Sequence, residues 1–123
     1  MIGTSIIQWN IQGLSNKKQE ILQVIHEHKA SILALQETQL KTEFLPTIPD
    51  FNVINKEGPS GARQHGGVAM YIHRSVPFDP VDLDTQFQAV AATVHLKTRL
   101  TLCNIYCPPS QLLNPNELLQ LFN

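Results

Sequence analysis

The chain has 123 residues, of which 42% are hydrophobic, and its formal net charge is −1 at pH 7. This length suits one ordinary domain, the hydrophobic fraction excludes a disordered chain, and the charge provides no overall basic field for nucleic acid. Charged residues make up only 15%, below the ~25% usual in soluble domains, so we expect apolar faces that contact further protein.

Neither end of the chain carries a membrane or secretion signal. No apolar run approaches the ~20 residues that span a bilayer, and residues 1–10 lack the charged and apolar regions of a signal peptide. We therefore expect an intracellular protein that is not secreted and has no membrane partner. Cys103 and Cys107 fall in one expected strand, too far apart for a disulfide, and are interpreted as buried free thiols.

The first third of the chain has the pattern of a strand, a helix and a second strand. The strands are expected at 5–10 and 32–38, and the helix ends near Lys29, with Ser15 or Asn16 as its N-cap. Such a crossover makes its two strands parallel, so their carboxyl ends meet at one edge of the sheet. This edge should bring Asn10 and Glu37 together.

The rest of the chain has antiparallel character. We expect strands at 51–55 and 68–73, a turn bracketed by Pro77 and Pro80, and a tight hairpin formed by 87–96 and 100–106. A last helix starts with Asn114 as N-cap and Pro115 at the first helical position. No linker divides the chain. One parallel unit followed by antiparallel strands predicts an α+β layered sandwich within a single domain, 1–123.

Polar residues stand where the first two strands end. Glu37 follows an apolar run and is either an ordinary solvent-facing carboxylate or a ligand for a hard cation such as Mg²⁺. Asn10 is either a turn cap or part of the same site. The loop 58–67 lacks the Lys-Ser/Thr ending of a P-loop, which argues against nucleotide binding. Its Arg63 is either a surface residue or a contact for a phosphate backbone.

The last expected strand ends at Tyr106, just before a double proline. Strand alternation places Asn104 and Tyr106 on one face and the two cysteines on the other. We assign the cysteine face to the core and the Tyr106 face to a more polar environment, in which the hydroxyl either meets water or contributes to a site.

The chain resembles the endonuclease/exonuclease/phosphatase superfamily in four segments that keep the family's order and spacing. They are Trp-Asn-Ile-Gln-Gly-Leu at 9–14, Leu-Gln-Glu-Thr at 35–38, Gly-Gly-Val-Ala at 66–69 and Asn-Ile-Tyr-Cys-Pro-Pro at 104–109. They look most similar to the apurinic-type endonuclease domain at the front of non-LTR (jockey-like) retrotransposon polyproteins. The resemblance implies a four-layered α/β sandwich, DNase I-like, with its site at one rim.

The resemblance also implies roles for three residues. Glu37 would ligate Mg²⁺, or alternatively Mn²⁺; Asn10 would help to bind phosphate and the metal shell; and Tyr106 would contact the scissile phosphate. The implied reaction is phosphodiester hydrolysis, in which the metal polarises the phosphate and a base activates water. In the retroelement members this nicks DNA and leaves a 3′-hydroxyl that primes reverse transcription. The implied partner is DNA, reached in the nucleus, and no small-molecule cofactor is implied.

Two motifs of the superfamily are missing. The resemblance would place the Asp-x-Asn motif and the Asp-His pair after Tyr106, and neither is found there; Asp79, Asp82 and Asp84 lie in an expected turn, and none of the five histidines follows an aspartate. We therefore interpret 1–123 as the N-terminal portion of one such domain, inactive and poorly soluble alone. Two alternatives stay open: another phosphodiesterase or phosphatase of the superfamily, and a nucleic-acid-binding remnant without catalysis.

Overall fold

The computed structural model describes residues 4–59, 65–108 and 115–121. The elements along them are β1 (Ile6–Asn10), α1 (Lys18–His28), β2 (Ile32–Gln36), the 3-10 helix η1 (Thr42–Phe44), β3 (Phe51–Lys56), β4 (Val68–His73), β5 (Phe78–Val81), β6 (Gln88–His95), β7 (Arg99–Tyr106) and α2 (Pro115–Leu121). Two residues of the sequence predictions lie outside the described residues: Arg63, interpreted as either a surface residue or a phosphate contact, and the expected N-cap Asn114.

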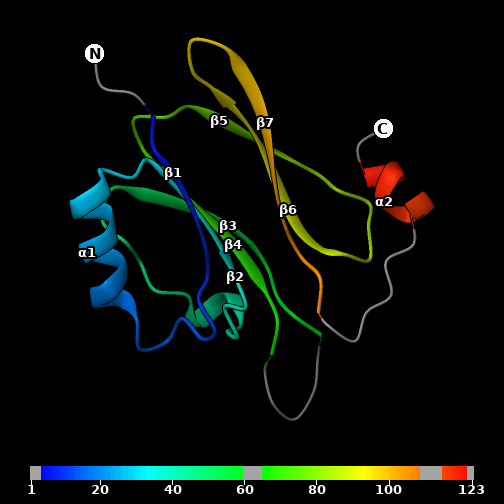
Figure 1. The fold of residues 1–123 in the computed structure, drawn as a ribbon, viewed down its shortest axis with the longest axis horizontal. Coiled ribbons are helices and arrows are strands. Elements are labelled where there is room, and N and C mark those ends of the chain that lie inside the picture. Colours follow the sequence, from blue (N-terminus) through cyan, green and yellow to red (C-terminus); the bar gives the residue numbers. More distant parts are fainter. Residues whose placement is uncertain (1–3, 60–64, 109–114, 122–123) are drawn as a thin grey trace.

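The strands form two sheets that face each other. The first has the order β1-β2-β4-β3, with β1 and β2 parallel, and the second has the order β5-β6-β7 and is antiparallel throughout. Figure 1 shows α1 on the outer side of the first sheet and α2 at the opposite end of the molecule. The predicted parallel pair and the predicted β6–β7 hairpin are confirmed. Within the described ranges, no helix has the length and apolarity needed to cross a bilayer.

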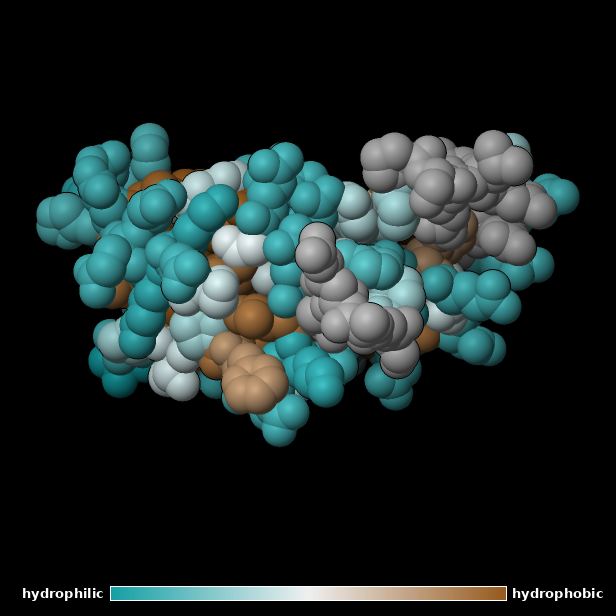
Figure 2. Space-filling model, turned by 90° about the horizontal axis from the view of Figure 1, so that it is seen from below, coloured by the Kyte–Doolittle hydropathy of each residue, from teal (hydrophilic) through white to brown (hydrophobic). Residues whose placement is uncertain are grey.

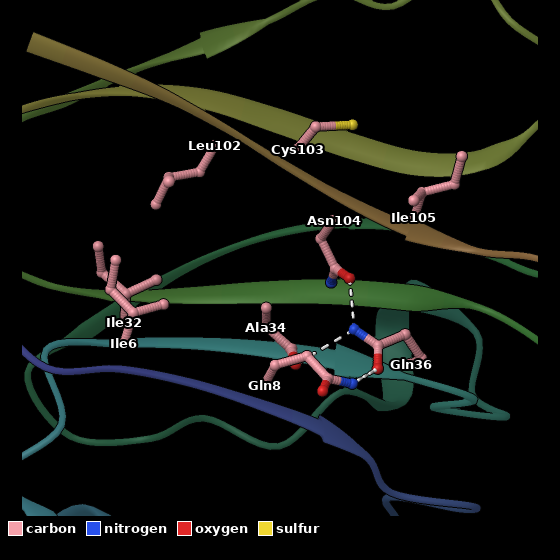
Figure 3. A pocket seen from close by; sticks show the side chains of 9 residues that line it. All are labelled: Ile6, Gln8, Ile32, Ala34, Gln36, Leu102, Cys103, Asn104 and Ile105. Atoms are coloured by element: carbon pink, nitrogen blue, oxygen red, sulfur yellow. Dashed lines mark hydrogen bonds between the residues drawn. The ribbon is translucent and has the colours of Figure 1, made fainter. Parts of the chain in front are cut away.

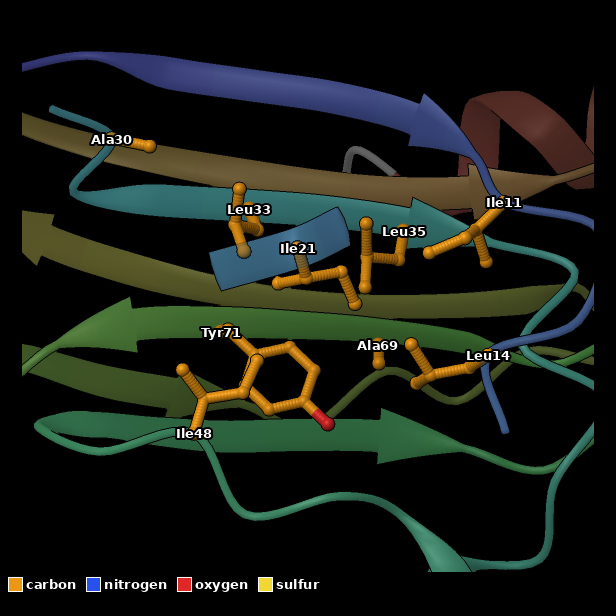
Figure 4. Packing of buried hydrophobic residues seen from close by; sticks show 9 residues of the cluster. All are labelled: Ile11, Leu14, Ile21, Ala30, Leu33, Leu35, Ile48, Ala69 and Tyr71. Carbon is orange, nitrogen blue, oxygen red and sulfur yellow. The ribbon is translucent and has the colours of Figure 1, made fainter. Parts of the chain in front are cut away.

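Two apolar layers hold these elements together. In the first, Ile21 of α1 packs with Leu33 of β2 and Tyr71 of β4 (Figure 4). In the second, Ile72 of β4 packs with Val94 of β6 between the two sheets. The first sheet is therefore covered on both faces, which explains why β2 and β4 have nearly continuous apolar sequences rather than an alternating pattern.

The start of α1 differs from the prediction. Its N-cap is Lys17, without a side-chain capping hydrogen bond, so neither Ser15 nor Asn16 caps the helix. The Lys17 ammonium instead donates a hydrogen bond to the backbone carbonyl of Ile11, which ties the start of the helix to the segment after β1. The predicted helix end is confirmed, because Lys29 is the C-cap in the left-handed conformation.

The turn predicted between Pro77 and Pro80 is wrong, because residues 78–81 form the strand β5. It pairs with β6, so that Asp79 lies opposite Thr93, and the Asp79 carboxylate approaches His95 Nε2 at 2.8 Å. Pro80 is compatible with this strand because β5 lies at the edge of its sheet, where a missing N–H can face away from the ladder.

The assignment of the cysteine face of β7 to the core is also wrong. Alternation along the strand is as predicted, but Asn104 is the buried residue, whereas Cys103 is half-buried and Cys107 is exposed, both as free thiols. The reason is that Asn104 finds hydrogen-bond partners between the sheets, which removes the usual cost of burying an amide.

Candidate active site

Three strands from both sheets end close to the same polar pair. Asn10 closes β1 and lies in register with Gln36, the last residue of β2 before Glu37. Tyr106 closes β7 in the other sheet. Its hydroxyl donates a 2.5 Å hydrogen bond to Glu37 Oε1 although 69 positions separate the two residues. The structure therefore joins Glu37 and Tyr106 directly. Asn10 shares their edge with an exposed side chain, which makes no hydrogen bond within the described part of the chain.

The Tyr106 hydroxyl of this pair is protonated at neutral pH. The hydrogen bond to Glu37 raises the pKa of Tyr106 to about 12, and burial and the negative charge of the carboxylate add to the effect. The phenol therefore remains a hydrogen-bond donor throughout the neutral range. The Tyr106 hydroxyl and the Glu37 carboxylate are thus hydrogen-bond partners, while their roles in a site stay predictions.

Glu37 has an unusual backbone conformation, with a φ of 55° in the left-handed region that most side chains avoid. Its neighbours hold this conformation from two sides. Gly13 N–H donates to the Glu37 carbonyl at 2.8 Å, and Thr38 N–H donates to the carbonyl of Gly67 at 3.2 Å. The left-handed residue turns the chain as it leaves β2, where the carboxylate meets β7.

The Gly66-Gly67 pair has two reasons to be glycine. Both residues have positive φ, 69° and 94°. A Cβ on Gly66 would lie 2.4 Å from Gln88 Oε1, and a Cβ on Gly67 would lie 2.5 Å from Thr38 Oγ1. The buried Gln88 side chain accepts a 2.6 Å hydrogen bond from Gly67 N–H. The sequence pointed to these glycines through the Gly-Gly-Val-Ala segment at 66–69, but no sequence signal pointed to Gln88.

Buried amides bridge the two sheets beside the pair (Figure 3). Asn104, which is 3% exposed, donates from Nδ2 to the carbonyls of Leu35 at 3.0 Å and Ala69 at 2.8 Å. Its Oδ1 accepts a 2.6 Å hydrogen bond from Gln36 Nε2, and Gln8 in turn donates to Gln36 Oε1. The sequence signal for this cluster is weak: a single Asn two positions before the strand-terminal tyrosine.

A cleft of about 330 Å³ opens next to these amides, between the edge strands β1 and β7 (Figure 3). Its lining is apolar where Ile6, Ile32 and Leu102 meet and polar at Gln8 and Asn104. Glu37 and Tyr106 do not line it. The cleft is therefore a gap between the two sheet edges and is separate from the pair.

The end of the molecule at which β1 and β2 finish is mostly hydrophilic, with a few apolar side chains visible near its centre (Figure 2). Glu37 and Asn10 offer a carboxylate and an amide oxygen there, which are the oxygen ligands that Mg²⁺ prefers. Among the described residues there is no group of three or more His, Cys, Asp or Glu that could hold a metal. Both side chains thus offer the type of oxygen atom that binds a hard cation, but only one of the two is a carboxylate.

Two facing sheets with a polar site at the rim where their strands end define an α+β sandwich of the DNase I-like class. Residues 7–118 match the Endonuclease/Exonuclease/phosphatase family, and the chain belongs to this family. A curated relative is the probable RNA-directed DNA polymerase from transposon X-element of Drosophila melanogaster, 29% identical over 112 residues. The matched segment is 89% of this chain and 12% of that protein.

Solved structures with the same fold include two of the protein NExo. The 3′ phosphatase NExo from Neisseria, bound to a product DNA hairpin, matches with a TM-score of 0.60 and 21% identity over 85% of this chain and 42% of its own. The 3′-5′ exonuclease NExo from Neisseria meningitidis matches with a TM-score of 0.58 and 23% identity over 82% and 41%. The chain therefore spans less than half the length of these proteins. The resemblance to the superfamily and to non-LTR retrotransposon polyproteins is confirmed.

Proposed function

We propose that the chain is the N-terminal portion of a metal-dependent endonuclease domain that nicks DNA for a non-LTR retrotransposon. The observation that carries this proposal is the 2.5 Å contact between Tyr106 and Glu37 at the rim where strands of both sheets end. The protonated phenol donates its single proton to the carboxylate and orients it for a cation, and it would contact a phosphate oxygen by turning that proton from Glu37 to the phosphate. The transposon relative, 29% identical, supports the retroelement assignment.

Glu37 and Asn10 would hold the Mg²⁺ or Mn²⁺ ion, which when bound would polarise the phosphodiester and stabilise its developing charge. The residues of this chain have their own tasks. Tyr106 donates its proton to the Glu37 carboxylate and so fixes the orientation of that carboxylate at the rim. The exposed Asn10 amide can donate to a second phosphate oxygen. DNA is the proposed partner, and action on chromosomal DNA would place the protein in the nucleus.

Residues 1–123 alone are proposed to be inactive. No Asp-His pair occurs in the sequence, and its Asp-x-Asn tripeptide, Asp50-Phe51-Asn52, stands at the start of β3 and not after Tyr106, so no candidate base stands ready to activate water. General-base assistance contributes typically ~10²–10⁴-fold in rate. One carboxylate and one amide also hold Mg²⁺ weakly, because most of the coordination shell is left to water.

We further propose that a longer polypeptide completes the domain along β1 and β7, the edge strands on either side of the cleft. Ile6 at this edge is 46% exposed, and unpaired strand edges with exposed apolar side chains promote aggregation. Residues 1–123 alone should therefore be poorly soluble, whereas a protein that continues beyond Asn123 should protect the β1 and β7 amides from hydrogen exchange.

The test compares residues 1–123 with a longer protein encoded by the continuing reading frame, using supercoiled plasmid DNA and Mg²⁺. The longer protein should nick the plasmid, and Glu37→Gln should reduce the rate at least ~100-fold, the scale of losing one electrostatic contact in an active site. Glu20→Gln is the matched control, because Glu20 is an exposed carboxylate on α1, and it should nick normally.

Other outcomes would correct specific parts of the proposal. Mg²⁺-dependent nicking by 1–123 that disappears in Glu37→Ala would show that the isolated chain is active. A longer protein that cleaves a phosphorylated inositol but leaves DNA intact would favour the other phosphodiesterases and phosphatases of the family. Salt-sensitive DNA binding without nicking by the longer protein would favour a binding remnant.

A further inference from the structure

The two sheets contact each other in two different ways. Far from the Glu37–Tyr106 pair the contact is apolar, as between Ile72 and Val94. Apolar contact is non-directional, so it holds the sheets together without fixing how one is aligned on the other. Near the pair the contact is made by buried amides, whose hydrogen bonds require defined distances and directions.

Asn104 supplies most of these directional contacts. Both acceptors of its Nδ2 group are backbone carbonyls of the other sheet, Leu35 on β2 and Ala69 on β4, and its Oδ1 accepts from Gln36. A buried amide with all of these contacts satisfied is compatible with one arrangement of the two sheets and not with a shifted one. The hydrogen bonds of Asn104 can therefore fix how β7 is aligned on β2 and β4.

The place of Asn104 along the chain relates it to the pair. Asn104 lies two positions before Tyr106 on β7, and its acceptor Leu35 lies two positions before Glu37. Alternation puts Asn104 and Tyr106 on the same face of β7, toward the first sheet. Gln88, the register partner of Tyr106 on β6, makes a second bridge to Gly67 N–H.

We propose that Asn104 is a positioning residue that aligns β7 on β2 so that the Tyr106 hydroxyl meets the Glu37 carboxylate. The inference deepens the proposed function and relies on it only in taking Glu37 and Tyr106 as groups of the active site. Asn104 itself does not touch the substrate; it acts through the alignment of the two strands that carry the pair.

The test reads the Tyr106 hydrogen bond directly, by the ¹³Cζ chemical shift of labelled tyrosine at neutral pH. It uses the longest soluble protein that contains these residues, with Tyr106 assigned from Tyr106→Phe. Glu37→Ala gives the reference shift without the hydrogen bond. Asn104→Ala should move the Tyr106 signal most of the way to that reference. The Tyr71 signal should stay, because its hydroxyl donates to Pro46 on the other face of the first sheet.

The matched control is Val94→Ala, which truncates another fully buried side chain of the same interface away from the pair. It should leave the Tyr106 shift at its unchanged value, although it too weakens the packing between the sheets. An unchanged Tyr106 signal in Asn104→Ala would overturn the proposal. So would a Val94→Ala shift as large as that of Asn104→Ala, because general loosening would then explain both.

A second measurement covers the case in which Asn104→Ala does not fold. In the unsubstituted protein under increasing urea, the protected side-chain amide protons of Asn104 and the hydrogen-bonded shift of Tyr106 should be lost together. A Tyr106 hydrogen bond that survives the loss of Asn104 protection would contradict the inference. Neither readout needs metal or DNA, so a negative result leaves the proposed function standing, and a failed nicking assay leaves the role of Asn104 standing.

Discussion

The Tyr106 hydroxyl donates a hydrogen bond to Glu37 Oε1 at 2.5 Å, which connects the two sheets. The contact exists only when both sheets are packed, because Glu37 directly follows β2 of one sheet and Tyr106 ends β7 of the other. It makes the phenol a fixed donor and orients one carboxylate oxygen toward it. The remaining oxygen of the carboxylate is thereby placed with respect to the rim, which is what a ligand to a cation requires.

The first prediction concerns the acidity of Tyr106. In Glu37→Ala the pKa of Tyr106 should fall from about 12 toward the ordinary value of 10. The substitution removes the hydrogen bond to Glu37, which is the largest cause of the raised pKa, and also the negative charge of the carboxylate. A ¹³Cζ titration resolves both tyrosines. Tyr71 is the internal control: burial alone raises its pKa to about 12, and it should keep that value in the variant.

The same shift predicts a dependence of stability on pH. A tyrosine whose folded pKa lies above its unfolded value binds its proton more tightly in the fold, so its contribution is fully present below pH 10 and is lost as pH rises toward 12. Glu37→Ala should therefore flatten the alkaline loss of stability between pH 10 and 12 in urea titrations. An equally steep loss in the variant would contradict the assigned cause.

Much of the fold could be predicted because its signals are local. The helical period between two apolar runs and the tight connection predicted at Thr98-Arg99 specify the parallel pair and the hairpin without long-range information. The strand β5 was missed for the opposite reason. Its four residues include Pro80 and have turn composition, and what makes them a strand is pairing with β6.

The site was predictable as separate residues and not as a contact. Asn10, Glu37 and Tyr106 each follow an apolar run, which marks a strand end, but the meeting of Glu37 with Tyr106 depends on how two sheets pack. The prediction assigned the wrong face of β7 to the core because hydropathy favours cysteine over asparagine in a core. Only the carbonyls of the opposite sheet reveal that Asn104 has partners there.

A third prediction tests Gly67, whose backbone carbonyl accepts from Thr38, the residue after Glu37. Gly67→Ala should destabilise the protein by ~1–3 kcal/mol, because the φ of 94° is unfavourable for alanine and the new Cβ would lie 2.5 Å from Thr38 Oγ1. Gly13→Ala is the matched control. Its φ is also positive, at 102°, but its Cβ would meet only the flexible end of Gln39 at 3.1 Å. Urea denaturation should give a clearly smaller loss for Gly13→Ala; equal losses would show that the contact with Thr38 costs nothing.

A fourth prediction concerns Lys56, which joins β3 to the segment before β6. Its ammonium donates to the carbonyls of Thr85 at 3.0 Å and Phe87 at 2.6 Å. Lys56→Met keeps the length of the side chain and leaves both carbonyls without this charged donor, so it should cost ~1.5–3 kcal/mol of stability. Lys97→Met, at an exposed lysine of the β6–β7 hairpin, should change the urea midpoint little. Similar midpoints for the two variants would mean that water replaces Lys56 without loss.

The last prediction follows from the orientation of β7, which buries Asn104 and leaves the two cysteines more accessible. Cys107 is exposed, whereas Cys103 is half-buried and burial raises the pKa of its thiol. The thiolate is the reactive form, so a raised pKa and restricted access both slow the reaction of Cys103. With a disulfide reagent at pH 8, one thiol should react rapidly and the second several-fold more slowly, and Cys107→Ser should remove the fast phase. Under denaturing conditions the two thiols should react alike, which shows that the difference belongs to the fold. A fast phase that persists in Cys107→Ser would instead place Cys103 on an accessible surface and contradict the orientation of this strand.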